Sequence, residues 1–239
     1  MAIEILDYPD RRAYLNPETQ EEAPSVTTIL GGGEDWFNWR LKKAIEAIYE
    51  RAGQELMPIN DAVTIGRARV DAYLMSHADA GTALHKYVET GQRLGDTGDP
   101  RWDGWVNNAC DSWDQFLDQS GLDPANMEHE VRLMKDGAFG PYGGTVDLVI
   151  KDPKGIDYDT VVELKTSRDI QPWHALQAAA YAYLWAGNRN VVGAVWVMQL
   201  GKYNVGHVIK KVNYASALAA FNRAHANYIH NTMEKLYVY

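Results

Sequence analysis

One stretch of the sequence, from Gly143 to Leu184, constrains the fold most, because it places charged side chains inside two strongly apolar strands. The first strand, GGTVDLVI, surrounds Asp147 with β-branched and aliphatic residues, and the second, VVELKTS, contains Glu163 and Lys165. Residues two positions apart in a strand face the same side. Carboxylates are rarely buried unless they are paired or bound to a metal, so the two acids together indicate a metal site.

This combination suits metal-assisted cleavage of a phosphodiester bond. Two carboxylates can bind a hard divalent cation, which would offset the charge on the phosphate and lower the pKa of a bound water. Lys165 could orient or deprotonate that water. Taken singly, Asp147 and the Glu-x-Lys pattern each describe an ordinary solvated strand face, so the prediction depends on both occurring in apolar runs.

The composition is that of a folded protein. Hydrophobic residues make up 46% of the 239, and eight Trp and fourteen Tyr provide a sizeable core. A single cysteine, Cys110, excludes a disulfide framework and a four-cysteine zinc or iron–sulfur site. No apolar run reaches membrane-spanning length and the N-terminus lacks the pattern of a secretion signal, so we expect a soluble, cytoplasmic protein without a membrane partner.

The net charge of −9 bears on the partner. Proteins that bind nucleic acid usually present a basic surface to phosphate, so this chain should bind non-specifically only weakly. A nucleic-acid partner would then be a short exposed end rather than a long duplex. The densest basic positions of the first half are expected to line its path, and they are Arg40, Lys42, Lys43, Arg67 and Arg69.

The apolar pattern changes its period near residue 126. Before that point, residues 1–24 look irregular and residues 24–30 look like a short extended or turn segment. Helices are expected at 34–52, 61–77, 78–90 and 102–119. Beyond it, strands are expected at 128–133, 142–151, 160–166, 191–199 and 203–212, with helices at 171–185 and 215–236. This order predicts one α/β domain over residues 1–239, with a mostly helical part at 1–125 packed on an α/β core at 126–239.

Four motifs in this order resemble those of a known family. Gly144-Thr-Val-Asp147 matches a G-x-x-D strand, and Glu163-Leu-Lys165 matches a (D/E)-x-K strand. The chain resembles the PD-(D/E)xK nuclease superfamily, and within it the RecB-like, phage-type exonucleases to which the mitochondrial genome maintenance exonuclease also belongs. The two remaining matches are a Q-x-x-x-Y helix, from Gln177 to Tyr181, and a G-x-x-x-H helix, from Gly81 to His85.

The resemblance implies a restriction-endonuclease-like core, a mixed central sheet flanked by helices, with a site that binds Mg²⁺ or Mn²⁺. Asp147, Glu163 and the carbonyl of Leu164 would hold the cation, and Lys165 would position or activate the attacking water. His85 would approach the cation from the helical half. Without the resemblance, a core or surface histidine is the simpler interpretation of His85.

Two further acids have open alternatives. Glu89 lies one helical turn beyond His85, where it could hydrogen-bond the imidazole, contact a second ion through water, or be solvated. Glu130 matches a position where the family often carries a glutamate near the site, and an exposed strand residue is an equal alternative.

The remaining candidates concern DNA. The resemblance implies that Gln177 and Tyr181 contact the DNA backbone or the catalytic lysine, although helix-to-sheet packing explains them as well. Hydroxyl and basic side chains that could contact phosphate are Ser25, Thr27, Thr166 and Arg168. Ser25 and Thr27 could instead cap the helix that follows them. Trp173 and His174 sit where a base could stack.

The function implied is that of a metal-dependent DNA exonuclease acting on single-stranded or frayed ends in phage-type recombination, replication or repair. Such an enzyme would work in the cytoplasm of a bacterial host, alongside a recombination or single-strand-binding protein. The single cysteine departs from the cluster-binding relatives, so no iron–sulfur cluster is expected. A structure-specific endonuclease and a non-catalytic DNA-end-binding accessory protein are the alternatives.

Overall fold

The computed structural model of the chain describes residues 2–8, 11–31, 80–93, 100–151, 158–186 and 191–234. The strands are β1 (Glu4–Asp7), β2 (Arg12–Asn16), β3 (Glu21–Pro24), β4 (Met127–Gly137), β5 (Gly140–Ile150), β6 (Tyr158–Lys165), β7 (Val191–Leu200) and β8 (His207–Lys211). The helices are α1 (Val26–Ile29), the helical residues 80–90, α4 (Pro100–Ser120), the short 3₁₀ helix η1 (Pro124–Asn126), α5 (Pro172–Ala186) and α6 (Tyr214–Glu234). The predicted helices at 34–52 and 61–77, and the basic residues on them, lie outside the described residues.

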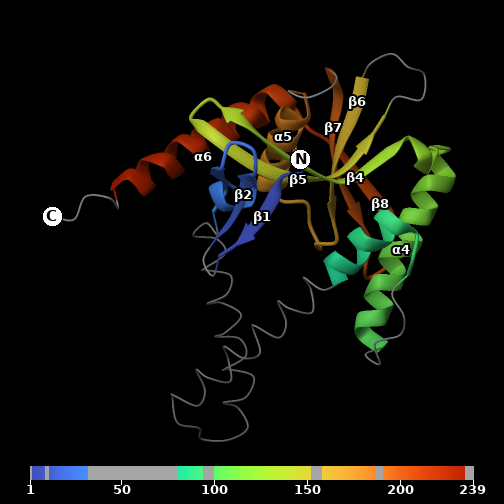
Figure 1. Cartoon of the computed structure of the whole chain (residues 1–239). Helices are drawn as coiled ribbons and strands as arrows, with labels where there is room; N and C mark the ends of the chain where they lie inside the picture. The colour runs from blue at the N-terminus through green and yellow to red at the C-terminus, as the bar shows by residue number, and fades with distance from the viewer. Residues whose placement is uncertain are drawn as a thin grey trace, which may run out of the picture.

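A five-stranded mixed sheet forms the centre of the molecule, with strand order β4-β5-β6-β7-β8 (Figure 1). Neighbouring strands are antiparallel except β6 and β7, which are parallel. Parallel neighbours need a crossover connection, and α5 supplies it between these two strands. The predicted α/β class is therefore confirmed, and the strands and helices after residue 126 lie close to their expected positions.

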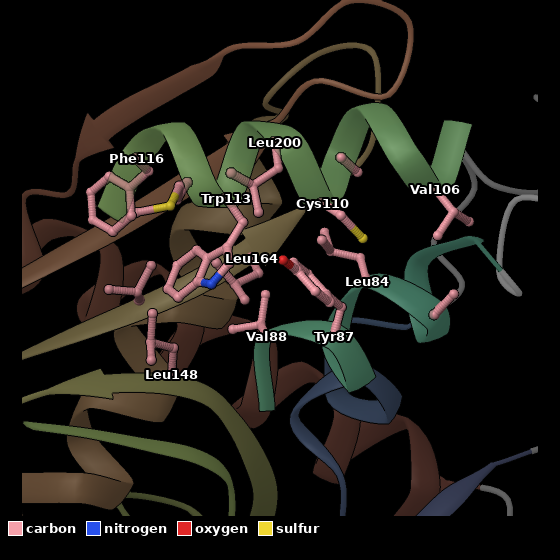
Figure 2. Close-up of a cluster of buried hydrophobic side chains, with 14 of the residues drawn as sticks. Leu84, Tyr87, Val88, Val106, Cys110, Trp113, Phe116, Leu148, Leu164 and Leu200 are labelled. Atoms are coloured by element: carbon pink, nitrogen blue, oxygen red, sulfur yellow. The ribbon is translucent and has the colours of Figure 1, made fainter. Parts of the chain in front are cut away.

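Two hydrophobic clusters cover the two faces of the sheet. Alternation along β6 sends Val162 and Leu164 to the cluster under α4 and the helical residues 80–90, and sends Val161 to the cluster under α5 and α6. In Figure 2, Leu84 and Trp113 point into the first cluster from the two covering helices.

The helical residues 80–90 are fixed to α4 by polar contacts as well as by packing. Tyr87 donates a hydrogen bond from its hydroxyl to Asp114 Oδ1 over 2.7 Å. Arg93 pairs with Asp111 and with the same Asp114 at 2.6 and 2.7 Å. These contacts hold the helix that carries His85 on this face of the sheet.

The N-terminal residues form a second, three-stranded antiparallel sheet, β1-β2-β3. The expectation of an irregular segment at residues 1–24 is therefore wrong. Each of these strands has only four or five residues, too few to show a clear alternation, and much of their order comes from contact with β5. Tyr14 of β2 lies over Gly143 and its hydroxyl is 2.8 Å from Thr145 Oγ1.

For residues 24–30, where a short extended or turn segment was expected, the structure has one helical turn, α1. Ser25 is its N-cap and accepts a hydrogen bond from the Thr28 N–H at 2.8 Å. An isolated bridge pairs Ser25 with Gly143. This bridge ties the first 30 residues to the strand that carries Asp147.

Replacing Gly143 with alanine should destabilise the protein by about 1–3 kcal/mol, the usual cost of overpacking a core. A Cβ at this position would lie 2.5 Å from the Tyr14 ring, and Tyr14 is buried. Urea denaturation measures the change in the free energy of unfolding. The matched control is Gly104→Ala in α4, where a Cβ meets nothing within 4 Å and better helix propensity should leave stability unchanged or higher. Equal stability of the two variants would contradict the packing of Tyr14 on β5.

Candidate metal centre

Strands β5 and β6 separate at two carboxylates. Their ladder ends where Leu148 pairs with Val162, so Asp147 and Glu163 are the next residues along the two strands. The Leu164 N–H donates to Asp147 Oδ2 over 2.8 Å. This bond bridges the gap between the strands and leaves the other oxygen of Asp147 available for a different partner.

A distorted residue in β4 brings a third carboxylate to the same place. The neighbouring pairs of the β4–β5 ladder place Glu130 opposite Asp147. The φ of Glu130 is 49°, in the left-handed region that non-glycine residues rarely adopt. Such a conformation costs about 1–3 kcal/mol and persists only where the surroundings impose it. This costly conformation lies beside a buried acid. It therefore favours the interpretation that Glu130 belongs to the site over the alternative that Glu130 is an exposed strand residue.

The helical residues 80–90 supply an imidazole to these acids. His85 Nδ1 lies 2.7 Å from Glu130 Oε1 and 3.7 Å from Asp147 Oδ1. The potential ligand atoms of the three side chains all lie within 4.8 Å of one another. Glu89 is exposed one turn further along, and the partner of His85 Nδ1 is Glu130 rather than Glu89.

Glu163 is fully buried, and only one of its two carboxylate oxygens has a hydrogen-bond partner among the described residues. Its Oε1 accepts a hydrogen bond from Lys165 Nζ, whereas its Oε2 has no hydrogen-bond partner among the described residues. A buried carboxylate oxygen without a partner is costly. The orphaned oxygen is therefore an observation that a bound cation, or a proton, would account for.

The crowded charges shift the pKa values of the cluster. Burial raises the pKa of Glu163 to about 8, with the Asp147 charge adding to the rise and Lys165 opposing it. Burial also raises the pKa of Asp147, against the charges of His85 and Lys165. Burial lowers the pKa of His85, but Asp147 and Glu130 outweigh it and raise that pKa to about 9. Without a cation, the cluster therefore keeps protons at neutral pH on His85 and, of the two coupled acids, on the more deeply buried Glu163.

Helix α5 places two polar side chains beside the acids. Gln177 Nε2 donates to Tyr181 Oη over 3.1 Å, and Gln177 Oε1 has no partner among the described residues. A Cβ on Gly144 would lie 2.5 Å from the Tyr181 ring, so the glycine lets this ring pack directly on β5. Burial raises the pKa of Tyr181, and the charges of Glu163 and Asp147 add to it. The residues therefore pack the helix on the sheet and also lie within electrostatic reach of the acids.

The hydroxyl side chains of α1 are engaged within the protein. Ser25 is buried and caps the helix, which is the structural alternative considered for it. The Thr27 hydroxyl lies 2.9 Å from Ser25 Oγ, and its side chain is exposed. Of the two, Thr27 is the one that a phosphate could reach.

The segment after β6 lies against the start of the helical residues 80–90. A Cβ on Gly81 would come within 3.8 Å of Thr166 Oγ1. Arg168 is exposed, and its carbonyl accepts a hydrogen bond from Gln199 Nε2 over 2.6 Å. Thr166 and Arg168 therefore follow Lys165 directly out of the buried cluster toward solvent.

The two aromatic side chains at the start of α5 have different surroundings. Trp173 is 49% exposed, whereas His174 is 2% exposed and its Nδ1 accepts a hydrogen bond from the Gln171 N–H over 3.1 Å. Because it is buried, His174 is not available to stack on a base, so that expectation is wrong. Ala178, Tyr181 and Ala182 follow His174 at helical spacing, and this pattern could have indicated that the imidazole is buried.

The donor set fits a hard or borderline divalent cation. Carboxylate oxygens are the ligands that Mg²⁺ and Mn²⁺ prefer, and an imidazole nitrogen suits transition metals. Glu130 joins His85 and Asp147 in a group of close ligand atoms, and Glu163, which was predicted beside them, is not part of that group. The carbonyl of Leu164 was expected to hold the cation, whereas the group of Leu164 that contacts Asp147 is its N–H. In the absence of a cation, protonated His85 balances part of the negative charge.

Tyr14 is a residue near the site that the sequence did not point to. Its hydroxyl meets Thr145, two residues before Asp147 on β5. Its strand, RAYLN, is too short for an alternating pattern to reveal which side chain faces a partner. Contact between the two sheets, which is a tertiary feature, is what places it.

Comparison with known protein families and with curated proteins found no match. Among solved structures, the chain is similar to one titled "Crystal structure of SSO0001", at 14% identity and a TM-score of 0.40. The similarity covers 81% of this chain and 85% of that one. A likeness of this degree carries no argument about activity, so the function is argued from the side chains themselves. Of the described helices, not one has the length and apolar character needed to cross a membrane.

Proposed function

We propose that this protein is a Mg²⁺- or Mn²⁺-dependent deoxyribonuclease of the PD-(D/E)xK type that hydrolyses phosphodiester bonds at DNA ends. The observation that carries the proposal is the close group of His85, Glu130 and Asp147. Glu163 follows the end of the β5–β6 ladder next to this group, bound to Lys165 and with one buried carboxylate oxygen unpaired among the described residues. Three acids at one place are too costly to keep for packing alone. They indicate a site that receives a cation.

The acids are held in position before any ligand arrives. The Leu164 N–H fixes Asp147 Oδ2, and the distorted backbone of Glu130 directs its carboxylate to His85. When bound, the cation would offset the charge of the scissile phosphate and lower the pKa of a water. The residues that would hold it are His85, Glu130, Asp147 and Glu163.

Lys165 is the residue that would meet the phosphate or the attacking water. Burial opposes its charge, but Glu163 outweighs burial and raises the pKa of Lys165. The side chain is therefore an ammonium in the free protein and can donate a hydrogen bond to the water or to a phosphate oxygen. A cation bound at the acids would oppose the ammonium charge, so the proton on Lys165 would be held less tightly and general-base action would become accessible.

The remaining features support DNA ends as the substrate. Gln177 and Tyr181 lie beside the acids, while Thr27, Thr166 and Arg168 offer polar groups between the site and solvent. The net charge of −9 disfavours a long duplex tract held by charge alone. Exonucleolytic action on single-stranded or frayed ends agrees with these polar groups and with the net charge. A phage-type recombination or single-strand-binding protein is the partner that such an activity would need.

Incubation of labelled linear DNA with the purified chain tests the proposal. Single-stranded DNA, and double-stranded DNA whose ends fray, should be degraded from their ends with Mg²⁺ or Mn²⁺ and left intact with EDTA. A circular single strand should survive, because it has no end. Cleavage of the circle would indicate a structure-specific endonuclease instead, and binding without cleavage under all conditions would indicate a DNA-end-binding accessory protein.

A further inference from the structure

A stripe of side chains on α5 leads from the buried acids to the surface. Trp173, Gln177 and Tyr181 follow one another at intervals of four residues, so they lie on one face of the helix. Tyr181 is 5% exposed at the inner end, Gln177 is also 5% exposed, and Trp173 is 49% exposed at the outer end. The indole therefore stands at the rim of the candidate site, while the rest of the stripe lines its interior.

Trp173 also lies beside the lysine of the site. Lys165 Nζ is 5.7 Å from the centre of the Trp173 ring, within the range of a cation–π interaction. One part of the indole thus lies near the ammonium and another part meets the His174 ring, while 49% of the residue remains exposed to solvent. A phosphate at Lys165 would bring its attached nucleoside within reach of this open surface.

The indole is held in place by the first turn of α5. The neighbouring His174 is buried and accepts a hydrogen bond from the Gln171 N–H, which fixes the start of the helix. The rings of Trp173 and His174 meet edge to face, with centroids 4.0 Å apart. An exposed tryptophan that is supported in this way loses little conformational freedom when it binds a partner.

Charge alone is a weak means of binding for this protein. Its 23 Lys and Arg are outnumbered by 32 Asp and Glu, and the site itself is rich in carboxylates. Base–aromatic stacking does not depend on charge and is tolerant of sequence, because every base has a π face. An aromatic platform at the rim of an acidic site is therefore a suitable way to hold a nucleic-acid end.

We infer that Trp173 is a stacking platform for the nucleobase next to the scissile phosphate, and that the substrate enters as an unpaired strand. This inference rests on the proposed function, because Lys165 marks where the phosphate lies. Stacking on the open face of the indole requires the base to leave its own stack. Single-stranded or frayed ends meet that requirement, and an intact duplex does not.

Binding of a fluorescent single-stranded oligonucleotide in EDTA, followed by anisotropy, tests the role of Trp173 without any cleavage. Trp173→Ala should weaken binding by about 5- to 100-fold, the range of a single base–aromatic contact, and Trp173→Phe should recover most of the loss. The dependence of affinity on salt should be the same in both variants, because no charge is lost. The matched control is Tyr158→Ala, which removes a 53% exposed ring from the opposite end of β6 and should bind like the wild type.

Oligonucleotides with one abasic position, moved along the strand, locate the stacked base. One position should weaken binding of the wild type and leave binding of Trp173→Ala unchanged. Equal affinity of Trp173→Ala and the wild type, or the same abasic profile for both, would overturn the inference while leaving the nuclease proposal in place. If the wild type binds no oligonucleotide in EDTA and cleaves none with Mg²⁺ or Mn²⁺, the proposed function itself fails, and the platform fails with it.

Discussion

Replacing Lys165 with alanine is expected to lower the rate of DNA cleavage by about 10²- to 10⁴-fold, the range of general acid–base contributions. The side chain is the only ammonium that the described residues place on Glu163, and it reaches out of the cluster toward Trp173. Asp147→Asn should cause a comparable loss, because it removes a charged ligand while keeping the oxygen that accepts from Leu164. Single-turnover assays with end-labelled single-stranded DNA measure both effects.

A matched lysine elsewhere in the fold provides the control. Lys135 Nζ lies 4.2 Å from the centre of the Tyr183 ring, so it resembles Lys165 in resting on an aromatic ring but stands on β4, away from the acids. Lys135→Ala should cleave at the wild-type rate. Circular dichroism should show all three variants folded, and full activity in folded Lys165→Ala or Asp147→Asn would refute the assignment of the site.

The metal-free protein should lose stability as the pH rises from about 5 to 9. Burial raises the pKa of Glu163 to about 8. Burial lowers the pKa of His85, but the charges of Asp147 and Glu130 outweigh it and raise that pKa to about 9. The folded state therefore holds protons that the unfolded chain releases. Their contribution to stability is complete at low pH and is lost as the pH rises through these values. Each pH unit in this window removes up to about 1.4 kcal/mol per proton, which corresponds to about 3–5 °C in Tm for a chain of this size.

Mg²⁺ or Mn²⁺ should reverse this loss. A cation competes with the protons for the same oxygen and nitrogen atoms, so the rise in Tm on adding it should be larger at pH 8 than at pH 6. Differential scanning fluorimetry measures how Tm changes with pH, once with the cation and once with EDTA. Glu163→Gln removes one of the titrating groups and should flatten the pH dependence in EDTA. A cation-induced shift that does not change with pH would contradict the cluster as the binding site.

Much of the second half of the fold could be predicted because its signals are local. Apolar strands, the continuous apolar run of α5, the period of about 3.6 residues on α6, and the turn residues between these elements are all recognisable in short windows of sequence. The same windows gave the position of Asp147 and the pairing of Glu163 with Lys165 on one strand. Since β5 and β6 are neighbours in the sheet, Asp147 and Glu163 are the residues that follow the last pair of their ladder.

The features that the sequence did not reveal depend on contacts between distant segments. The three-stranded sheet of residues 4–24 has strands too short for a pattern, and it is ordered through Tyr14 and Ser25 against β5. The placement of Glu130 depends on a backbone conformation that no propensity favours for glutamate. The burial of His174 depends on how the first turn of α5 packs on its neighbours.

The positive φ of Glu130 has a consequence for attempts to engineer this chain. A redesign that ranks substitutions by thermal robustness alone would prefer glycine or asparagine at this position, since both relieve the local penalty. It would thereby delete the carboxylate that approaches His85. A stabilised variant obtained in this way would lack one of the acids of the candidate metal centre, so position 130 should be held constant in any such library.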